Sequence, residues 1–536
     1  MTPPSFIWIS FEDTSPRFGC YGDPVARTPN VDQLAAEGGV YHQAYSTSPV
    51  CSPSRASVYT GMYPTFLGAQ HMRTILHDHP EMPVFPLPYT CVPPPYVTYF
   101  TEHLRAAGYH CSNSGKSDSQ FGLDLQECPF TAWDINLPYS DEHPAPWRER
   151  PDNTPFFAVF NLPETHESGM WAMGSAVETD PGAVTVPPYL PDTPEVRHTL
   201  ALQYDAIARN DARVGRIIEE LKRDGLYEST VIMIWSDHGE GQPRAKRWPY
   251  EAGLRVPLVV RTPETILPNA GYDDRLVSLI DLAPTVLELA GITPPVHLQG
   301  QSLFAPRPRQ HCFGSRDRFD ESYDMIRSVR DSRFRYSRNY YPRLPRLQWI
   351  PYSFRHASHQ AMISQPEGHG GTTFYEDSRP PEELYDLAND PWEINNLADN
   401  PEHQDILHQL REVMHGWQRD YDPYRDITET AMRERFWPGG QQPQTGEPGL
   451  FAIGEEADPN KLIADGAVLK HPVALYWYCP TQGASIGYTL EEGDRWLLAG
   501  PPLTLDPGSY ALRAKAVRTG CRESEDVVLR FTIDGD

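Results

Sequence analysis

The sequence predicts an α/β fold in which helices flank a mostly parallel central sheet. Two apolar runs, at residues 6–11 and 230–235, have the length and composition of buried strands. Between them, residues 196–223 repeat apolar side chains at helical spacing. Strands that alternate with helices form parallel sheets covered on both faces, because each crossover helix packs back onto the sheet.

Further strands and helices follow the same pattern and then become less regular. Two strands, one helix and an antiparallel strand pair are predicted at residues 155–161, 256–261, 276–289, and 327–330 with 334–336. A turn followed by a helix is expected from residue 383. These shorter, aromatic-rich segments predict a smaller α+β region after the first domain.

The last part of the chain predicts a small β-sandwich. Five short strand-like runs separated by turns lie at residues 473–479, 486–490, 496–498, 510–517 and 527–533. Before them, a stretch rich in Gly, Pro and Gln has the composition of a linker. These boundaries divide the chain into an α/β domain at residues 1–310, a smaller α+β subdomain at 311–438 and a β-sandwich-like module at 449–536.

The composition argues against two classes of partner. Acidic residues outnumber basic residues by 72 to 46, so the net charge of −26 disfavours nucleic acid. No uninterrupted apolar run approaches the roughly 20 residues that span a bilayer, so we expect no membrane insertion. An anionic substrate is compatible with this charge, because salt screens charges beyond roughly 8 to 10 Å and a local basic pocket can dominate.

The cysteines and the first residues bear on the cellular compartment. The eight cysteines are scattered, without the paired spacing of zinc or redox sites. The chain start runs directly into a strand-like segment and lacks the charged and apolar parts of a secretory signal. The sequence as written therefore predicts a cytoplasmic protein, and a periplasmic or secreted location is the alternative if a leader has been removed.

The segment Cys51-Ser52-Pro53-Ser54-Arg55 carries the most specific signal in the chain. It places a potential nucleophile and a permanent cation on one turn of a predicted helix. A structural interpretation is also open, because Pro53 favours a helix start and Cys51 is then only a small buried residue. The residues described next favour the chemical interpretation.

Acidic residues follow two of the predicted strands. Glu12 and Asp13 come directly after the first strand, and Asp237 and His238 come directly after the strand at residues 230–235. Open α/β sheets bind ligands beyond the carboxyl ends of their strands, so these four side chains should share one site. Carboxylate oxygens together with one imidazole suit a divalent cation.

Cys51, Pro53 and Arg55 match the signature Cys-x-Pro-x-Arg, and the chain resembles the formylglycine-dependent (type I) sulfatases of the alkaline phosphatase superfamily. It is most similar to bacterial glycan sulfatases related to heparan N-sulfatase. The resemblance implies an alkaline phosphatase-like fold and hydrolysis of a sulfate ester or N-sulfate of a sulfated carbohydrate. It also implies that a formylglycine-generating or sulfatase-maturating enzyme oxidises Cys51 to formylglycine, whose hydrate attacks sulfur.

The resemblance also implies roles for residues that are scattered over the chain. The implied metal ligands are Glu12, Asp13, Cys51, Asp237 and His238. The implied catalytic groups are Cys51, Arg55, Lys116, His166 and Lys246. Arg55 stabilises the formylglycine, the two lysines contact sulfate oxygens, and His166 protonates the leaving oxygen. Ca²⁺ is the expected metal and Mn²⁺ the alternative, because the residues at 12 and 238 depart from the commoner Asp and Asn.

Five residues are predicted to bind the substrate: His71, Arg73, Asp118, Arg316 and Arg318. Four of them lie in segments that are richer in charge than a core requires, and recognition of sugar hydroxyls or of a uronate carboxylate is expected there. An ion-paired loop is the alternative interpretation of these segments. At residues 117–118, Ser and Asp replace the Trp and His of related sulfatases, so Asp118 is expected to meet the sugar.

Two other functions remain open from the sequence. A phosphonate monoester or phosphodiester hydrolase of the same superfamily is favoured by His238, because such enzymes carry a histidine there. A glycan-binding protein without catalysis would leave Cys51 unmodified and would bind through the β-sandwich-like module. The sequence carries no signal for an oligomeric state or for a particular sugar.

Overall fold

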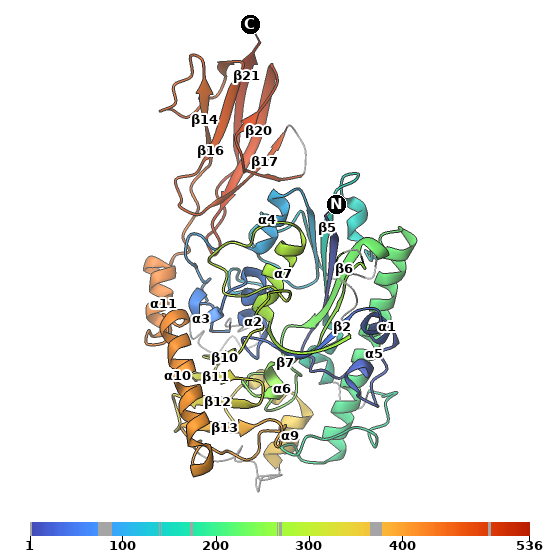
Figure 1. Ribbon diagram of the computed structural model, residues 1–536. Coiled ribbons are helices and arrows are strands. Elements are labelled where there is room, and N and C mark those ends of the chain that lie inside the picture. The colour runs from blue at the N-terminus through green and yellow to red at the C-terminus, as the bar shows by residue number, and fades with distance from the viewer. Residues whose placement is uncertain are drawn as a thin grey trace.

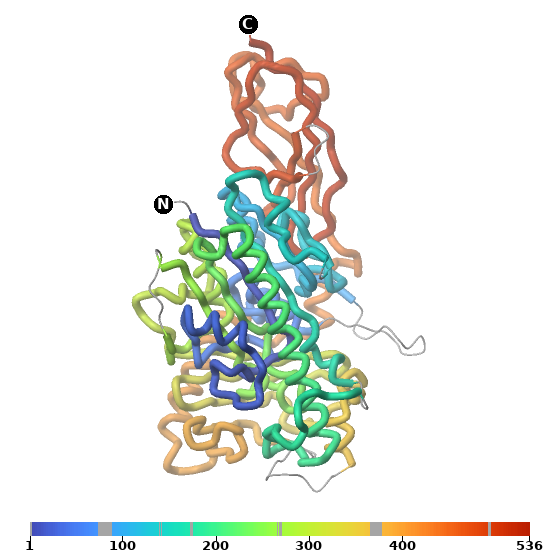
Figure 2. The backbone as a smooth tube through the Cα atoms, turned by 90° about the vertical axis from the view of Figure 1, so that its right-hand side faces the viewer, coloured from blue at the N-terminus to red at the C-terminus, as the bar shows by residue number. Residues whose placement is uncertain are grey.

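The computed structural model describes residues 3–72, 88–138, 140, 142–171, 175–264, 266, 271–364, 378–490 and 495–535. Within them lie one nine-stranded sheet, one four-stranded sheet, and a three-stranded and a five-stranded sheet near the end of the chain. Figure 1 shows the last strands standing above the rest of the molecule, and the side view in Figure 2 places them at the same end. The nine-stranded sheet positions the site described below.

The nine-stranded sheet is mostly parallel, as predicted. In pairing order its strands are β4 (Ile135–Leu137), β3 (His110–Ser114), β5 (Phe156–Leu162), β1 (Ser5–Phe11), β6 (Thr230–Ser236), β8 (Leu258–Arg261), β2 (Gly39–Tyr45) and β7 (Arg255–Val256), and β9 (Gly271–Ser278) also pairs with β2. β1 is parallel to both its neighbours, β5 and β6, whereas β7 and β8 run antiparallel to theirs. The parallel strands therefore end at one common edge.

The described α-helices are α1 (Pro29–Ala36), α2 (Cys51–Thr60), α3 (Pro64–Leu67), α4 (Phe100–Ala106), α5 (Pro194–Arg223), α6 (Glu251–Leu254), α7 (Leu282–Leu289), α8 (Pro351–Phe354), α9 (Ala357–Ser364), α10 (Gln404–Tyr421) and α11 (Glu429–Phe436). Among them, none combines the length and the apolar character needed to cross a bilayer.

Helices cover both faces of the central sheet, because successive side chains of a strand point to opposite faces. Ile7 and Ile9 of β1 pack with residues of α1 and α5 on one face. Phe6 and Trp8 pack with residues of α2, α4 and α7 on the other face. Figure 1 shows α1 and α5 on one side of the strands and α2, α4 and α7 on the other. Each such fully buried apolar side chain contributes about 1.5–3 kcal/mol to folding.

The four-stranded sheet is antiparallel and consists of β10 (Cys312–Arg316), β11 (Ile326–Arg330), β12 (Phe334–Asn339) and β13 (Glu382–Asp386). The predicted antiparallel pair is confirmed as β11 and β12. Val329, Tyr336 and Leu384 form a core with residues of α10. The turn predicted from residue 383 was wrong, because these residues pair with β12 as strand β13 before the chain turns.

The end of the chain forms the predicted β-sandwich. Its sheets contain β14 (Gly449–Gly454), β16 (Val473–Tyr478) and β19 (Leu503–Thr504), and β15 (Ala467–Lys470), β21 (Val527–Asp534), β20 (Gly508–Val517), β17 (Ser485–Leu490) and β18 (Leu497–Leu498). Leu450 and Leu475 of the first sheet share a core with Leu512 and Phe531 of the second. The sandwich is attached to the larger part by hydrogen bonds such as that from Arg105 to the Trp496 carbonyl over 2.6 Å.

Two predicted elements differ in extent from the structure. The helix predicted at 276–289 begins only at α7, because its first residues complete β9 and Ser278 and Asp281 then cap the helical segment reciprocally. The strand predicted at 256–261 is divided into β7 and β8 around Pro257, which cannot donate a ladder hydrogen bond.

Candidate active site

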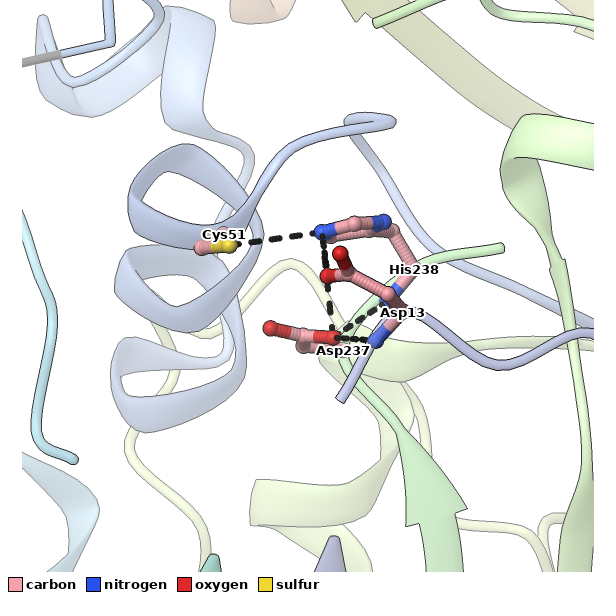
Figure 3. Close-up of side chains that lie close together, drawn as sticks. All are labelled: Asp13, Cys51, Asp237 and His238. Carbon is pink, nitrogen blue, oxygen red and sulfur yellow. Dashed lines mark hydrogen bonds and ion pairs between the residues drawn. The ribbon is translucent and has the colours of Figure 1, made fainter. Parts of the chain in front are cut away.

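The site lies where β1 and β6 end next to each other at the carboxyl edge of the central sheet. β1 leads into Glu12 and Asp13, and β6 leads into Asp237 and His238. The two ends are joined, because the Asp13 backbone N–H donates to Asp237 Oδ1 over 3.2 Å. Cys51 is the first residue of α2, and Figure 3 shows its sulfur directed at the side chains from these two ends.

Four buried side chains form a compact cluster of possible ligand atoms. One atom each from Asp13, Cys51, Asp237 and His238 lies within 4.8 Å of all the others. His238 Nε2 is 3.4 Å from Cys51 Sγ, 3.1 Å from Asp13 Oδ1 and 3.8 Å from Asp237 Oδ1. The predicted convergence of the two strand ends and the Cys51 segment is therefore present in the fold.

The chemistry of this cluster fits a divalent cation. The Gly239 carbonyl can only accept a hydrogen bond, and it lies 2.9 Å from His238 Nδ1, so Nδ1 carries a proton and Nε2 is the ring nitrogen that could bind a metal after losing its own proton. Asp13 Oδ1 is buried and accepts no well-aligned hydrogen bond, although it lies close to Nε2. Burial lowers the pKa of His238, but Asp237 and Asp13 outweigh it and raise that pKa to about 10. This negative field also favours a metal ion.

Arg55 holds the acids behind this cluster in place. Its guanidinium is fully buried and contacts Asp237 Oδ2 at 3.1 Å, Glu12 Oε1 at 3.3 Å and Asn161 Oδ1 at 2.6 Å. Lys116 Nζ lies 3.3 Å from the same Glu12 oxygen. Glu12 therefore pairs with two cations beside the four-residue cluster, and its role as a metal ligand stays a prediction.

Two lysines flank Cys51 and set its electrostatic environment. Burial raises the pKa of the Cys51 thiol, but Lys116 and Lys246 outweigh burial and lower that pKa to about 7. Burial also disfavours the charged ammonium groups, yet Asp118 keeps the pKa of Lys116, and Asp13 that of Lys246, well above the usual value. Both lysines are therefore cationic beside residue 51, where they can bind the oxygens of an anion.

His166 follows β5 and reaches the same site. Its Nδ1 lies 2.8 Å from Ser168 Oγ, and its Nε2 faces Lys246 Nζ at 3.4 Å. Burial and Lys246 lower the pKa of His166, but Asp13 and a hydrogen bond with Cys51 outweigh them and raise it above 6.5. The ring can thus hold a proton next to residue 51 near neutral pH, as a general acid must.

Two residues of the site were missed by the sequence analysis. The Glu167 carboxylate accepts hydrogen bonds from both Nη groups of Arg247, over 3.0 and 2.9 Å. One of its oxygens also lies 2.9 Å from Lys246 Nζ. Asn161 is the residue before the last of β5, and its side-chain oxygen accepts a hydrogen bond from Arg55. Both residues flank His166 at the end of a predicted strand, so their place at the carboxyl edge was the available signal.

Asp118 lies in the site, but its side chain is not accessible to solvent. Its side chain is fully buried, with one oxygen 2.9 Å from Lys116 Nζ and the other accepting from Ser52 Oγ. This arrangement positions Lys116 beside the start of α2. A direct role of Asp118 in sugar binding stays a prediction that this placement does not support.

The other predicted substrate-binding residues lie in a buried ion-paired region or outside the described residues. Arg318 pairs with Glu429 at 2.7 Å, and its backbone N–H donates to His71 Nδ1 over 3.1 Å. Arg316 packs 4.0 Å above the Trp248 ring and lies 3.6 Å from an Asp324 oxygen. These contacts match the ion-paired alternative. Arg73 lies outside the described residues.

His71 is expected to make the fold sensitive to acid. Burial lowers the pKa of His71 to about 4, below the unfolded value of 6.5. The unfolded chain therefore binds the proton first, so this contribution is complete above pH 6.5 and is lost as the pH falls towards 4. His71→Asn should reduce the loss of unfolding free energy between pH 7 and 4.5 by about 2–3 kcal/mol.

Urea unfolding at the two pH values measures this effect. His415→Asn is the matched control, because His415 is an exposed histidine on α10. Equal acid sensitivity of the wild-type protein and His71→Asn would contradict the assignment of this loss to His71.

The chain belongs to the sulfatase family, because the family model described as Sulfatase matches residues 4–292. An ulvan-active sulfatase of Formosa agariphila is 34% identical, over 98% of this chain and 91% of the relative. Human N-sulphoglucosamine sulphohydrolase is 26% identical, over 81% of this chain and 94% of the relative. The protein is accordingly a sulfuric ester hydrolase, and its family implies a divalent metal and a formylglycine.

The fold is shared more widely than the sulfatase activity. The crystal structure of a phosphonate monoester hydrolase from Agrobacterium radiobacter superposes with a TM-score of 0.54 at 18% identity, over 80% of this chain and 99% of that one. This likeness confirms the alkaline phosphatase-like fold. It does not favour the phosphodiesterase alternative, because both relatives described above are sulfatases.

Proposed function

We propose that this sulfatase removes a sulfate group from a sulfated carbohydrate, using a formylglycine made from Cys51. The observation that carries the proposal is the place of Cys51, buried at the first residue of α2 between Lys116 and Lys246 and facing the acid–imidazole cluster. A thiol that only filled space would not need two buried cations and three possible metal ligands around it.

The groups around residue 51 have complementary tasks. When present, the formylglycine supplies the nucleophile for sulfur and the metal supplies positive charge to the sulfate oxygens. Lys116 and Lys246 bind the remaining sulfate oxygens, and Arg55 holds the acids that face the metal. His166 gives its proton from Nε2 to the leaving oxygen, so that the sugar departs as a neutral alcohol or amine.

Ca²⁺ is the proposed metal, with Mn²⁺ as the alternative. Asp13 and Asp237 offer hard carboxylate oxygens, which Ca²⁺ prefers. His238 adds an imidazole, which suits Mn²⁺ better than Ca²⁺. Because the sulfate would itself add oxygen ligands, oxygen donors dominate the site during the reaction, and this favours Ca²⁺.

A sulfated carbohydrate is the proposed substrate class because the relative aligned over nearly the whole chain is named an ulvan-active sulfatase. We also propose the domain division stated above, with the site carried by residues 1–310. Its support is that the central, four-stranded and sandwich sheets fall into the three segments in turn. Cys51 is 2% exposed, so the proposed maturating enzyme must reach it before α2 packs against the sheet.

Release of inorganic sulfate from a panel of defined sulfated oligosaccharides tests the proposed function. The expected result is release from at least one O- or N-sulfated oligosaccharide, with a far higher kcat/KM than for the phosphodiester bis(4-nitrophenyl) phosphate. Turnover of the phosphodiester that exceeds turnover of every sulfate by orders of magnitude would instead establish the phosphodiesterase alternative.

A further inference from the structure

The groups beside His166 define where the sugar must lie. In the proposed function, on which this inference rests, His166 protonates the oxygen that stays with the sugar. That oxygen must come within hydrogen-bonding distance of the His166 ring, about 2.6–3.2 Å between heavy atoms. A sugar in that position must contact side chains that pack next to His166.

Aromatic side chains from two distant segments meet next to His166. The rings of His166 and Tyr352 pack edge to face with centroids 6.4 Å apart. Tyr352 packs in the same way against Trp171, with centroids 4.5 Å apart. Trp171 ends the short helical segment that follows His166, whereas Tyr352 belongs to α8. Only the fold brings these rings together.

Tyr352 is close to the catalytic charges. Burial raises the pKa of Tyr352 to about 12, and the charges of Lys246 and Glu167 act on its hydroxyl. The hydroxyl thus keeps its proton at neutral pH and can donate a hydrogen bond. The Trp171 indole N–H is a second potential donor: its nitrogen is buried, and within the described part of the chain it has no hydrogen-bond partner.

The aromatic cluster also contains a cation, and unlike the cations around Cys51 this one is exposed. Arg355 lies 5.2 Å from the centre of the Trp171 ring and is exposed, whereas Arg55, Lys116 and Lys246 are all largely buried. A guanidinium that packs over an aromatic ring keeps its charge, and with five N–H groups it can bind an anion in addition to other partners. An exposed cation at this position attracts negative charge despite the net charge of the chain.

We propose that Trp171, Tyr352 and Arg355 form the subsite for the sugar that bears the sulfate. The aromatic rings pack against the apolar C–H groups of the sugar, and their N–H and O–H groups donate to its oxygens. Arg355 pairs with a second anionic group, a carboxylate or a further sulfate, on the same or the adjoining sugar. The substrate class is therefore a glycan with at least two anionic groups near the scissile bond.

The test compares a substrate that has a sugar with one that has none. The probes are 4-nitrophenyl sulfate and the oligosaccharide that the wild-type enzyme desulfates fastest in the panel. Trp171→Ala should lower kcat/KM for the oligosaccharide about ten-fold more than for the aryl sulfate, mainly through KM. Tyr272→Ala is the control, because Tyr272 is an exposed tyrosine at the opposite, amino-terminal end of β9, and it should change neither value.

Arg355→Gln tests the anionic part of the subsite separately, and it also keeps the test valid if Trp171→Ala does not fold. It should lower kcat/KM for the oligosaccharide about ten-fold more than for the aryl sulfate. If the anion is a carboxylate, this difference disappears when the carboxyl groups of the oligosaccharide are reduced to alcohols. If the anion is a further sulfate, the difference persists after reduction.

Equal losses on the two probes in both folded variants, or no loss on the oligosaccharide, overturn the subsite. A wild-type enzyme that hydrolyses the aryl sulfate but no oligosaccharide also overturns it, and leaves the sulfatase chemistry standing. Absence of turnover on both probes by fully formylglycine-bearing enzyme overturns the proposed function itself.

Discussion

Cys51→Ala is expected to lower kcat for sulfate release by at least about 10⁴-fold while the protein stays folded. The sulfur contacts His238 Nε2 at the start of α2, and its removal leaves the apolar cores on both faces of the sheet unchanged. Sulfate release from the best panel substrate gives the rate, and thermal unfolding reports the fold. The mass of the peptide that contains residue 51 shows whether the wild-type protein carries the aldehyde.

Cys312→Ala is the matched control, because Cys312 is also buried but lies on β10 and is 4% exposed. It should keep full activity. Retained turnover in Cys51→Ala would contradict the formylglycine mechanism. A wild-type protein from its native host that carries only the thiol and releases no sulfate would instead support the non-catalytic glycan-binding alternative.

Asp237→Asn is expected to lower kcat/KM by about 10³-fold and to weaken metal binding. One oxygen of Asp237 belongs to the four-residue cluster, and the other accepts a hydrogen bond from Arg55 Nε. The substitution therefore removes a negative charge from the cluster and from the contact with Arg55. Treatment of the wild-type enzyme with EGTA should cause a comparable loss, and added Ca²⁺ should restore the rate. Elemental analysis by mass spectrometry before and after EGTA counts the bound ion.

Asp211→Asn serves as the control for this change, because Asp211 is a buried carboxylate that binds backbone N–H groups at the start of α1. It should not alter the metal content. Full activity of a wild-type enzyme that has been shown to be free of metal would refute the metal site. If Mn²⁺ restores the rate better than Ca²⁺ does, the metal site is confirmed and Mn²⁺ is its ion.

The regular elements of the central sheet were predictable because their signals are local. The strand predicted at 230–235 and the helix predicted at 196–223 correspond to β6 and α5 within two residues at each end. A buried strand between two helix layers is apolar throughout, and a helix on a sheet repeats with a period of 3.6 residues. β13 was not predictable in this way, because it forms only when β12 pairs with it.

The site was predictable where a residue type and a strand end coincide. Asp13 and Asp237 follow two buried strands, and the parallel pairing of β1 with β6 brings them together. The burial of the charged residues predicted to bind substrate could not be predicted in this way, because the neighbours of a residue in the sequence do not show whether its side chain is exposed. Arg318 is buried because Glu429, which lies 111 residues away in the chain, pairs with it. The carboxylate of Glu167 is likewise held by Arg247, from the segment after β6.

The sequence by itself determined the α/β class, the motif at Cys51 and the side chains at the strand ends, since each depends on residues that are neighbours in the chain. Only the tertiary structure decided which charges are paired and which face the substrate. It placed Asp118 against Lys116 and Ser52 and brought Tyr352 beside His166. Burial and pairing depend on partners that are distant in the chain, and a buried charge is stable only where such a partner reaches it.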